Sequence, residues 1–196
     1  MVTLRSSRFF SSGIIDIKKR IILTVILTIL LFTVLYISSM MPFSSEELDS
    51  LLKQAEEILK KNFTILDIFL NNFTVSLLIF IPVVGPIVGG YAIYVTGRIM
   101  GALATSTGIP SILLISIAII TFYGLVEFLA YGTAFAESII FSYSIFKREI
   151  KREYRWVLIS LIVTALLLLV AATIEYLLIQ FFGQLYPEPD KIIAKI

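Results

Sequence analysis

Four long apolar runs constrain the fold of this chain more than any other feature of its sequence. They cover residues 21–41, 63–107, 109–146 and 156–182. A helix needs about 20 apolar residues to cross the roughly 30 Å hydrocarbon core of a bilayer. The composition agrees, since 58% of the residues are hydrophobic and only 15% are charged, unlike a soluble domain. We predict an all-α, polytopic membrane helical bundle with about five transmembrane helices, broken or re-entrant segments and one external amphipathic helix.

The side chains available for chemistry are few. The 196-residue sequence contains neither Cys nor His, which excludes disulfides, thiolate chemistry, Cys-ligated metal sites and nucleophilic triads that need a His base. We therefore expect no enzymatic activity, no cofactor, no metal and no nucleic-acid binding. The expected partners are the lipid bilayer and either other membrane proteins or a second copy of the chain in a homodimer.

The N-terminal segment, residues 1–20, is basic and leads directly into the first apolar run. It carries one acid, Asp16, against five basic residues: Arg5, Arg8, Lys18, Lys19 and Arg20. A basic flank is retained in the cytoplasm. A secretory signal peptide is the rival interpretation, but the run is long and no A-x-A cleavage site follows it. We expect a retained anchor that opens a single transmembrane domain over residues 21–182, with an external C-terminal tail over 183–196.

Residues 44–61 follow the first run and have the pattern of an amphipathic surface helix. Ser44 and Glu47 match a capping box, and apolar residues recur at helical spacing on one side. We expect this helix to be external and to cover its own bundle, although it could also lie on the membrane or bind a partner. Asn62 begins an Asn-x-Thr sequon, which permits glycosylation if this side is external.

The strongest basic patch, in residues 147–155, predicts a second cytoplasmic segment. The preceding run of about 38 residues, 109–146, is too long for one helix across the bilayer. It should fold back near Tyr123-Gly124, as two spans or as a re-entrant pair, and return to the side it left. Residues 63–107 would then cross an odd number of times and carry Arg98 to the cytoplasmic side.

Helix-breaking residues interrupt the run 63–107. Pro82, Gly85 and Pro86 break or bend a helix, and the Gly-x-x-x-Gly spacings starting at Gly85 and Gly97 allow close helix contacts. Tight packing is one explanation. The other is a discontinuous helix lining an ion or substrate site, as in transporters. Arg98 would then be a counter-charge to an acid in the membrane, although an interfacial Arg98 is the simpler interpretation.

Two acids, Glu127 and Glu137, lie inside an otherwise apolar run. On one helix they share a stripe of small and polar residues with Tyr131 and lie about 15 Å apart along the axis. Carboxylates in a bilayer are costly and normally face other helices or a wet cavity. A third acid, Glu175, lies about 19 residues into the last run and is expected near the external surface.

The sequence also resembles a known family, on motifs that recur in the same order over roughly residues 15–182. These are Asn71-Asn72, Thr96-Gly97-Arg98-Ile99-Met100-Gly101, Tyr123-Gly124-Leu125-Val126-Glu127-Phe128-Leu129-Ala130 and Ala171-Ala172-Thr173-Ile174-Glu175. They are similar to those of the stage II sporulation protein M family of bacterial and archaeal membrane proteins. The family pattern has Asn-Gly at Thr96-Gly97 and His-Gly-x-x-Glu at Tyr123. Because this His is missing, a proton-relay or metal role does not carry over, whereas Gly124 and Glu127 fit a turn and a buried polar anchor.

The resemblance implies a membrane scaffold, since the best-studied bacterial relative works with cell-wall-degrading partners to move a membrane during engulfment. A chain without Cys and His but rich in Ile and Lys would suit a thermophilic archaeon. We therefore expect a scaffold or assembly factor in membrane remodelling or envelope organisation. The alternative is a small transporter, channel or permease-like subunit that uses the carboxylates Glu127 and Glu137 in the membrane.

Overall fold

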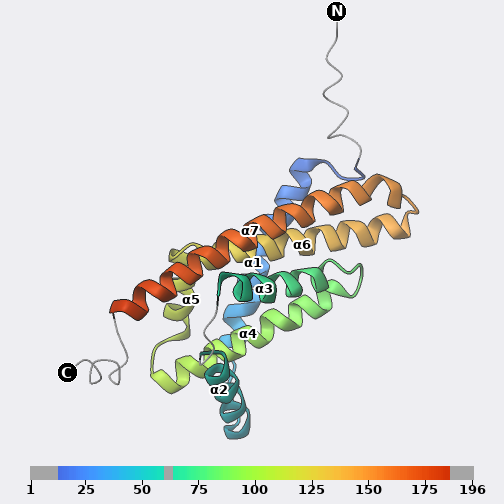
Figure 1. Cartoon of the computed structure of the whole chain (residues 1–196). Helices are drawn as coiled ribbons and strands as arrows, with labels where there is room; N and C mark the ends of the chain where they lie inside the picture. Colours follow the sequence, from blue (N-terminus) through green and yellow to red (C-terminus); the bar gives the residue numbers. More distant parts are fainter. Residues whose placement is uncertain (1–12, 60–63, 186–196) are drawn as a thin grey trace, which may run out of the picture.

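The computed structural model describes residues 13–59 and 64–185. Within these ranges the chain forms seven α-helices and no strand (Figure 1). They are α1 (Ile17–Met40), α2 (Ser45–Leu59), α3 (Ile65–Ile79), α4 (Gly85–Thr107), α5 (Ser111–Ile120), α6 (Tyr123–Phe146) and α7 (Ile150–Leu185). The predicted all-α architecture is confirmed.

Four of these helices, α1, α4, α6 and α7, are long and apolar enough to cross a membrane. The helices α3 and α5 are apolar but shorter, with 15 and 10 residues. The predicted number of about five spans thus corresponds to four long helices and two short ones. At 1.5 Å per residue, the 36 residues of α7 extend for about 54 Å, which exceeds the thickness of a bilayer core.

The long run 109–146 is broken as predicted, and the break lies next to Tyr123-Gly124. Helix α5 ends at Ile120 and α6 begins at Tyr123. Phe122 between them has a φ of 65°, a left-handed conformation that ends a helix. A Cβ atom on Gly124 would lie 2.9 Å from the carbonyl oxygen of Ala118. The absence of a side chain at Gly124 therefore lets α6 start close against α5.

The bundle has two ends, which we name by their contents. At the basic end, residues 13–20 meet the α6–α7 connection, because the amide of Ile14 donates to the carboxylate of Glu153. This contact and that of Arg152 with the carbonyl of Gly13 place residues 147–155 at the same end of the bundle as residues 13–20. At the α2 end, α1 stops and α2 and α5 begin, since the Ser111 hydroxyl lies 3.4 Å from the carbonyl oxygen of Ser39.

Helices α3 and α4 form a hairpin, and this overturns the predicted topology of residues 63–107. The turn between them lies against the C-terminal half of α6, where the Val83 amide donates to Ser142 Oγ at 2.8 Å and Ser138 Oγ donates to the carbonyl of Ile81 at 2.9 Å. Helix α4 then returns to the α2 end. The chain therefore crosses an even number of times here, and the prediction that Arg98 lies on the side of the N-terminal flank is wrong.

The predicted direction of residues 109–146 was also wrong, because the two ends of this segment lie at opposite ends of the bundle. It was predicted to return to the side it left, whereas α5 starts at the α2 end and α6 finishes at the basic end. The reason is that α5 has only 10 residues, about 15 Å of helix, which is too short to cross a bilayer, whereas α6 is long enough to do so. Because these two errors of parity cancel, residues 147–155 lie at the same end of the bundle as residues 13–20.

Pro82 lies in the α3–α4 turn and Gly85 and Pro86 begin α4, so they do not interrupt a single membrane helix. Pro86 lies in the first turn of α4, where a missing backbone donor costs nothing. A Cβ atom on Gly85 would lie 2.0 Å from the carbonyl oxygen of Ile79, so only glycine permits this tight return. The discontinuous-helix interpretation is therefore replaced by a compact hairpin.

Small residues let the backbones of α4 and α6 approach α1 closely. A Cβ atom on Gly97 would lie 2.4 Å from the carbonyl oxygen of Leu35, one on Gly101 2.3 Å from that of Ser39, and one on Gly132 2.1 Å from Thr28 Oγ1. The Gly-x-x-x-Gly face of α4 is thus occupied within the chain. Around these contacts lies an apolar core, which includes Leu27, Leu31, Leu35, Ile79, Ile93, Ile115, Phe128, Phe135 and Leu168.

Helix α2 contacts its own bundle, as the preferred interpretation predicted, but only through α4 among the described helices. Its first turn is capped by Ser44, whose hydroxyl accepts from the amide of Glu47 at 3.2 Å. Leu51 and Ala55 are buried on its apolar side, where α2 packs on α4, while the helix projects away from the bundle (Figure 1). The sequon residue Asn62 lies outside the described residues.

We predict that Gly97→Ala destabilises the protein by about 1–3 kcal/mol, because the new methyl group would overpack the α1–α4 contact. Gly90→Ala is the matched control in the same helix, since nothing lies within 4 Å of its added Cβ. This control should be neutral or stabilising by up to about 1 kcal/mol. Unfolding in detergent, followed by circular dichroism, measures both. Equal effects of the two substitutions would contradict the close α1–α4 contact.

Candidate functional site

A buried ionic cluster, formed by Arg20, Glu137 and Glu153, joins three helices at the basic end. Arg20 lies in the first turn of α1, Glu137 in α6 and Glu153 in the first turn of α7. They are only 5%, 3% and 0% exposed. Arg20 Nη1 donates to Glu137 Oε1 at 2.5 Å, and Arg20 Nη2 donates to Glu153 Oε2. One guanidinium therefore ties α1 to both helices of the α6–α7 hairpin.

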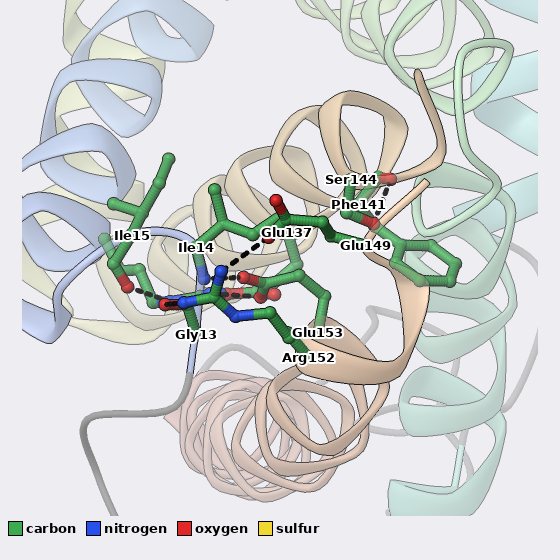
Figure 2. A network of polar contacts seen from close by, with 10 residues as sticks. Gly13, Ile14, Ile15, Glu137, Phe141, Ser144, Glu149, Arg152 and Glu153 are labelled. Atoms are coloured by element: carbon green, nitrogen blue, oxygen red, sulfur yellow. Dashed lines mark hydrogen bonds and ion pairs between the residues drawn. The ribbon is translucent and has the colours of Figure 1, made fainter. Parts of the chain in front are cut away.

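The backbone before α1 belongs to the same cluster. The Ile14 amide donates to Glu153 Oε1, and Arg20 Nε donates to the carbonyl of Ile15 at 3.2 Å. Figure 2 shows Ile14, Glu137 and Glu153 converging from separate parts of the chain. The Trp156 ring lies 4.8 Å from Arg20 Cζ, within the range of a cation–π interaction. The cluster thus also fixes the segment by which the chain enters the bundle.

The charges within this cluster do not balance. Two carboxylates face one guanidinium, and Glu137 Oε2 is buried without a hydrogen bond of normal geometry from the described residues. Desolvation offsets most of the attraction in a buried ion pair, so such a group adds little net stability. Removing one partner is costly, however, because the remaining charges stay buried. The cluster therefore acts mainly on specificity: any other arrangement of the three helices would leave a buried charge unpaired and would have a higher free energy.

Sequence reasoning assigned Arg20 to a solvated basic flank and overlooked Glu153 within the basic patch. The structure starts α1 at Ile17, so Arg20 is helical and buried, and α7 already begins within the patch. A signal was present, because Arg20 lies 7, 11 and 15 residues before Leu27, Leu31 and Leu35. These spacings put it on the same helical face as the core leucines. Trp156 is likewise buried beside Arg20.

Arg98 forms a second buried cationic site, at the α2 end. It is 3% exposed. Its Nη1 donates to the carbonyl of Met41 at 2.6 Å and to that of Ser38 at 3.3 Å, and its Nη2 donates to the carbonyl of Pro42 at 2.9 Å. These acceptors lie at the C-terminus of α1, where carbonyls lack helical partners. Arg98 is therefore a C-terminal cap for α1.

The same guanidinium also anchors α2. Arg98 Nη2 lies 2.8 Å from Glu47 Oε1, and the Phe43 ring lies 3.8 Å from Arg98 Cζ. The proposal of Arg98 as counter-charge to Glu127 or Glu137 is thus corrected, because its partner is Glu47 and the partner of Glu137 is Arg20. Arg98 makes five hydrogen bonds to four acceptor atoms, which its planar fork of donors permits.

The remaining acids of the bundle meet between α6 and α7. Glu127 and Tyr131 lie one turn apart on α6, and Glu175 lies on α7, which packs along α6. Glu175, expected near the external surface, is half-buried against α6. Glu127 and Glu137 do share one helix, as predicted, but they belong to two separate groups about 15 Å apart.

The other predicted site residues have local roles. In α3, Asn71 Nδ2 donates to Asn72 Oδ1 at 3.2 Å, and Asn72 is buried. Among residues 13–59 and 64–185, no three acidic side chains are arranged as a metal site. A cavity of about 560 Å³ lies at the α2 end and is lined by α1, α2, α4, α5 and their connections, away from Glu127 and Glu137.

We predict that Arg20→Met destabilises the protein by about 3–5 kcal/mol, because Glu137 and Glu153 would remain buried without a counter-charge. Combining it with Glu137→Gln and Glu153→Gln should recover most of this loss. Arg152→Gln is the control, since Arg152 and Glu149 form an exposed pair at 2.6 Å that contributes less than about 1 kcal/mol. Unfolding in detergent measures all three proteins. A triple variant no more stable than Arg20→Met would refute the charge argument.

We predict that Arg98→Lys loosens the corner between α1 and α2, because one ammonium group cannot reach the acceptors that the guanidinium contacts. The loss of buried hydrogen bonds to a charged group should cost about 1.5–3 kcal/mol. Hydrogen exchange of the amides in residues 41–47 should accelerate, while exchange in α6 and α7 stays unchanged. Glu47→Gln should have the smaller effect, as Glu47 is 42% exposed. A uniform acceleration in both variants would contradict a local role of Arg98.

The comparisons with known proteins agree with this architecture. The family described as Stage II sporulation protein M matches residues 21–178, which is most of the chain and includes all four long helices in whole or in large part. Neither a curated protein nor a solved structure matches the chain. The order of the motifs around Arg98, Glu127 and Glu175 had predicted the same relationship. The chain is a membrane protein that belongs to the stage II sporulation protein M family.

Proposed function

We propose that this protein is a non-enzymatic scaffold or assembly factor of a membrane complex, acting in membrane remodelling or envelope organisation. The proposal rests on one observation: the two buried arginines of the described residues, Arg20 and Arg98, are both bound to groups within the chain. Arg20 is bound by Glu137 and Glu153, and Arg98 by the end of α1 and Glu47. A transport site needs charged groups that can change partners, whereas these groups fix helix positions.

Two surfaces are available to partners in this proposal. The polar side of α2 is exposed at one end of the bundle, including Asp49 and Lys53, and Lys151, Arg152 and Arg155 are exposed at the other. By the excess of basic residues, the basic end is cytoplasmic and α2 and the C-terminus are external. The basic residues suit anionic lipid headgroups or an acidic partner. A rigid bundle with a recognition surface on each side of the membrane is what a scaffold requires.

Transport remains the second candidate, on one specific observation. Glu127 and Glu175 come from different helices and approach each other in an apolar region, together with Tyr123 and Tyr131. Acids inside a membrane often mark ion or proton pathways. They also serve as hydrogen-bonding anchors between helices. The position of Glu127 and Tyr131 one turn apart on α6, the helix that packs along α7, favours the anchor role.

Flux measurements separate the two candidates. Purified protein and the variant Glu127→Gln would be reconstituted into vesicles, and proton and sodium flux measured against protein-free vesicles. As a scaffold, the protein should give background flux in both forms. Flux by the natural chain that Glu127→Gln abolishes, with an unchanged circular dichroism spectrum, would overturn the scaffold proposal.

Site-specific cross-linking in cells tests the scaffold role directly. A photoreactive residue at Lys53, on the exposed side of α2, should give one discrete adduct with another membrane protein or with a second copy of this chain. The same residue at Ile162, which is 60% exposed on α7, is the control and should react mainly with lipid. Failure to form a protein adduct from Lys53 and from Lys151 at the basic end would contradict the proposal.

A further inference from the structure

The cavity at the α2 end has the position of a lipid site. It is an open groove of about 560 Å³ whose walls come from the end of α1, the α1–α2 connection, the end of α4 and the start of α5. Helix α1 has 24 apolar-rich residues, about 36 Å of helix, so its end lies near the boundary between acyl chains and headgroups. The volume falls within the range of about 300–1,000 Å³ typical of ligand pockets.

The groove is continuous with the lipid-facing surface of the bundle. Met40 and Ile112, which line it, are 63% and 48% exposed. Their neighbours Ile37 and Leu113 are 58% and 53% exposed on the same helices. Large apolar side chains on a membrane helix face hydrocarbon, so the surface that contacts the bilayer extends into the groove. An acyl chain can therefore enter from the side without crossing water.

The lining favours a hydrocarbon chain over a charged headgroup. It combines flexible methionines, prolines and aromatic rings with the hydroxyl groups of Tyr36, Ser39, Thr105 and Ser111, and it includes no charged residue. Methionine side chains adapt to irregular apolar ligands. Arg98 lies behind the Phe43 ring, but it is 3% exposed and already bound to Met41, Pro42 and Glu47. No free cation is therefore offered to a phosphate by the described lining.

We propose that this groove binds one acyl chain of a bilayer lipid and holds it more tightly than the surrounding annular lipid. The contacts of Arg98 build the wall that makes the site, since they fix the backbone of Met41 and Pro42 in place. The inference rests on the membrane location of the bundle and is independent of the scaffold role. It predicts a single retained lipid whose chain, rather than its headgroup, contacts residues 36–43 and 110–112.

The test uses the full chain in vesicles of phosphatidylcholine that carries a photoreactive group on one acyl chain, close to its ester bond. After irradiation, adducts should concentrate in residues 36–43 and 110–112. Native mass spectrometry during stepwise delipidation should show one lipid retained. Adducts spread evenly over the exposed faces of α1 and α7, or obtained at this place only from a headgroup-labelled lipid, would overturn the proposal.

A pair of substitutions at the end of α4 provides the matched control. Thr105 and Ser106 are both exposed, and each hydroxyl bonds to a carbonyl of its own helix, but only Thr105 lines the groove. Thr105→Trp should fill the groove and reduce the retained lipid at least fivefold, whereas Ser106→Trp should leave it unchanged. If both variants retain the lipid equally, or lose it equally, the lipid is annular and does not occupy the groove.

A second pair of tryptophan substitutions keeps the proposal testable if a variant of the first pair does not fold. Ile112 and Leu113 are adjacent, similarly exposed and apolar, and only Ile112 lines the groove. Ile112→Trp should reduce lipid retention and Leu113→Trp should not. The circular dichroism spectrum and the unfolding temperature of each variant should match those of the natural chain. If the two folded variants of each pair retain the same amount of lipid, the groove does not hold the lipid.

Discussion

The buried contact of Arg20 with Glu137 and Glu153 fixes the arrangement on which the rest of the bundle depends. Inside a membrane, apolar faces have little preference among partners, because lipid chains are as apolar as leucine. Packing alone therefore leaves helix register weakly specified. A buried guanidinium between two carboxylates has few acceptable geometries, since any displacement leaves a charge unpaired in a low-dielectric region. This contact selects how α1 lies across the α6–α7 hairpin and where the chain enters it.

Glycine contacts along α1 also fix its position, in addition to the ionic cluster at its start. Gly97 and Gly101 of α4 and Gly132 of α6 admit α1 at distances that any side chain would prevent. Arg98 closes the opposite end by capping α1 and holding α2. Helix α1 is thus fixed by an arginine cluster at its start, glycine contacts along its length and a second arginine at its end. Met41 and Pro42, whose carbonyls accept from Arg98, also line the groove at the α2 end.

Much of the fold follows from local sequence signals. The apolar runs predicted the membrane helices, Ser44 predicted the start of α2, and the length of 109–146 predicted a break beside Tyr123-Gly124. Glu127 and Glu137 were recognised as unusual because each is an acid within an apolar run. Their partners were not identified, since nothing in a single sequence distinguishes Arg20 from Lys18 and Lys19 except its position on the helical face of Leu27 and Leu31. Pairing is a property of helices brought together in space.

The sequence by itself determined that this chain is helical, that it lies in a membrane and which residues begin or break its helices, because these depend on hydrophobicity and on backbone chemistry within a few residues. Only the tertiary structure decided that α3 and α4 form a returning hairpin, that the short α5 joins α4 to α6 and that Arg98 lies with Glu47 at the α2 end. Few charged residues flank α3, α4 and α5, so flanking charge says little about the direction in which they run. Contacts between segments distant in the chain decide that direction, and hydropathy does not encode them.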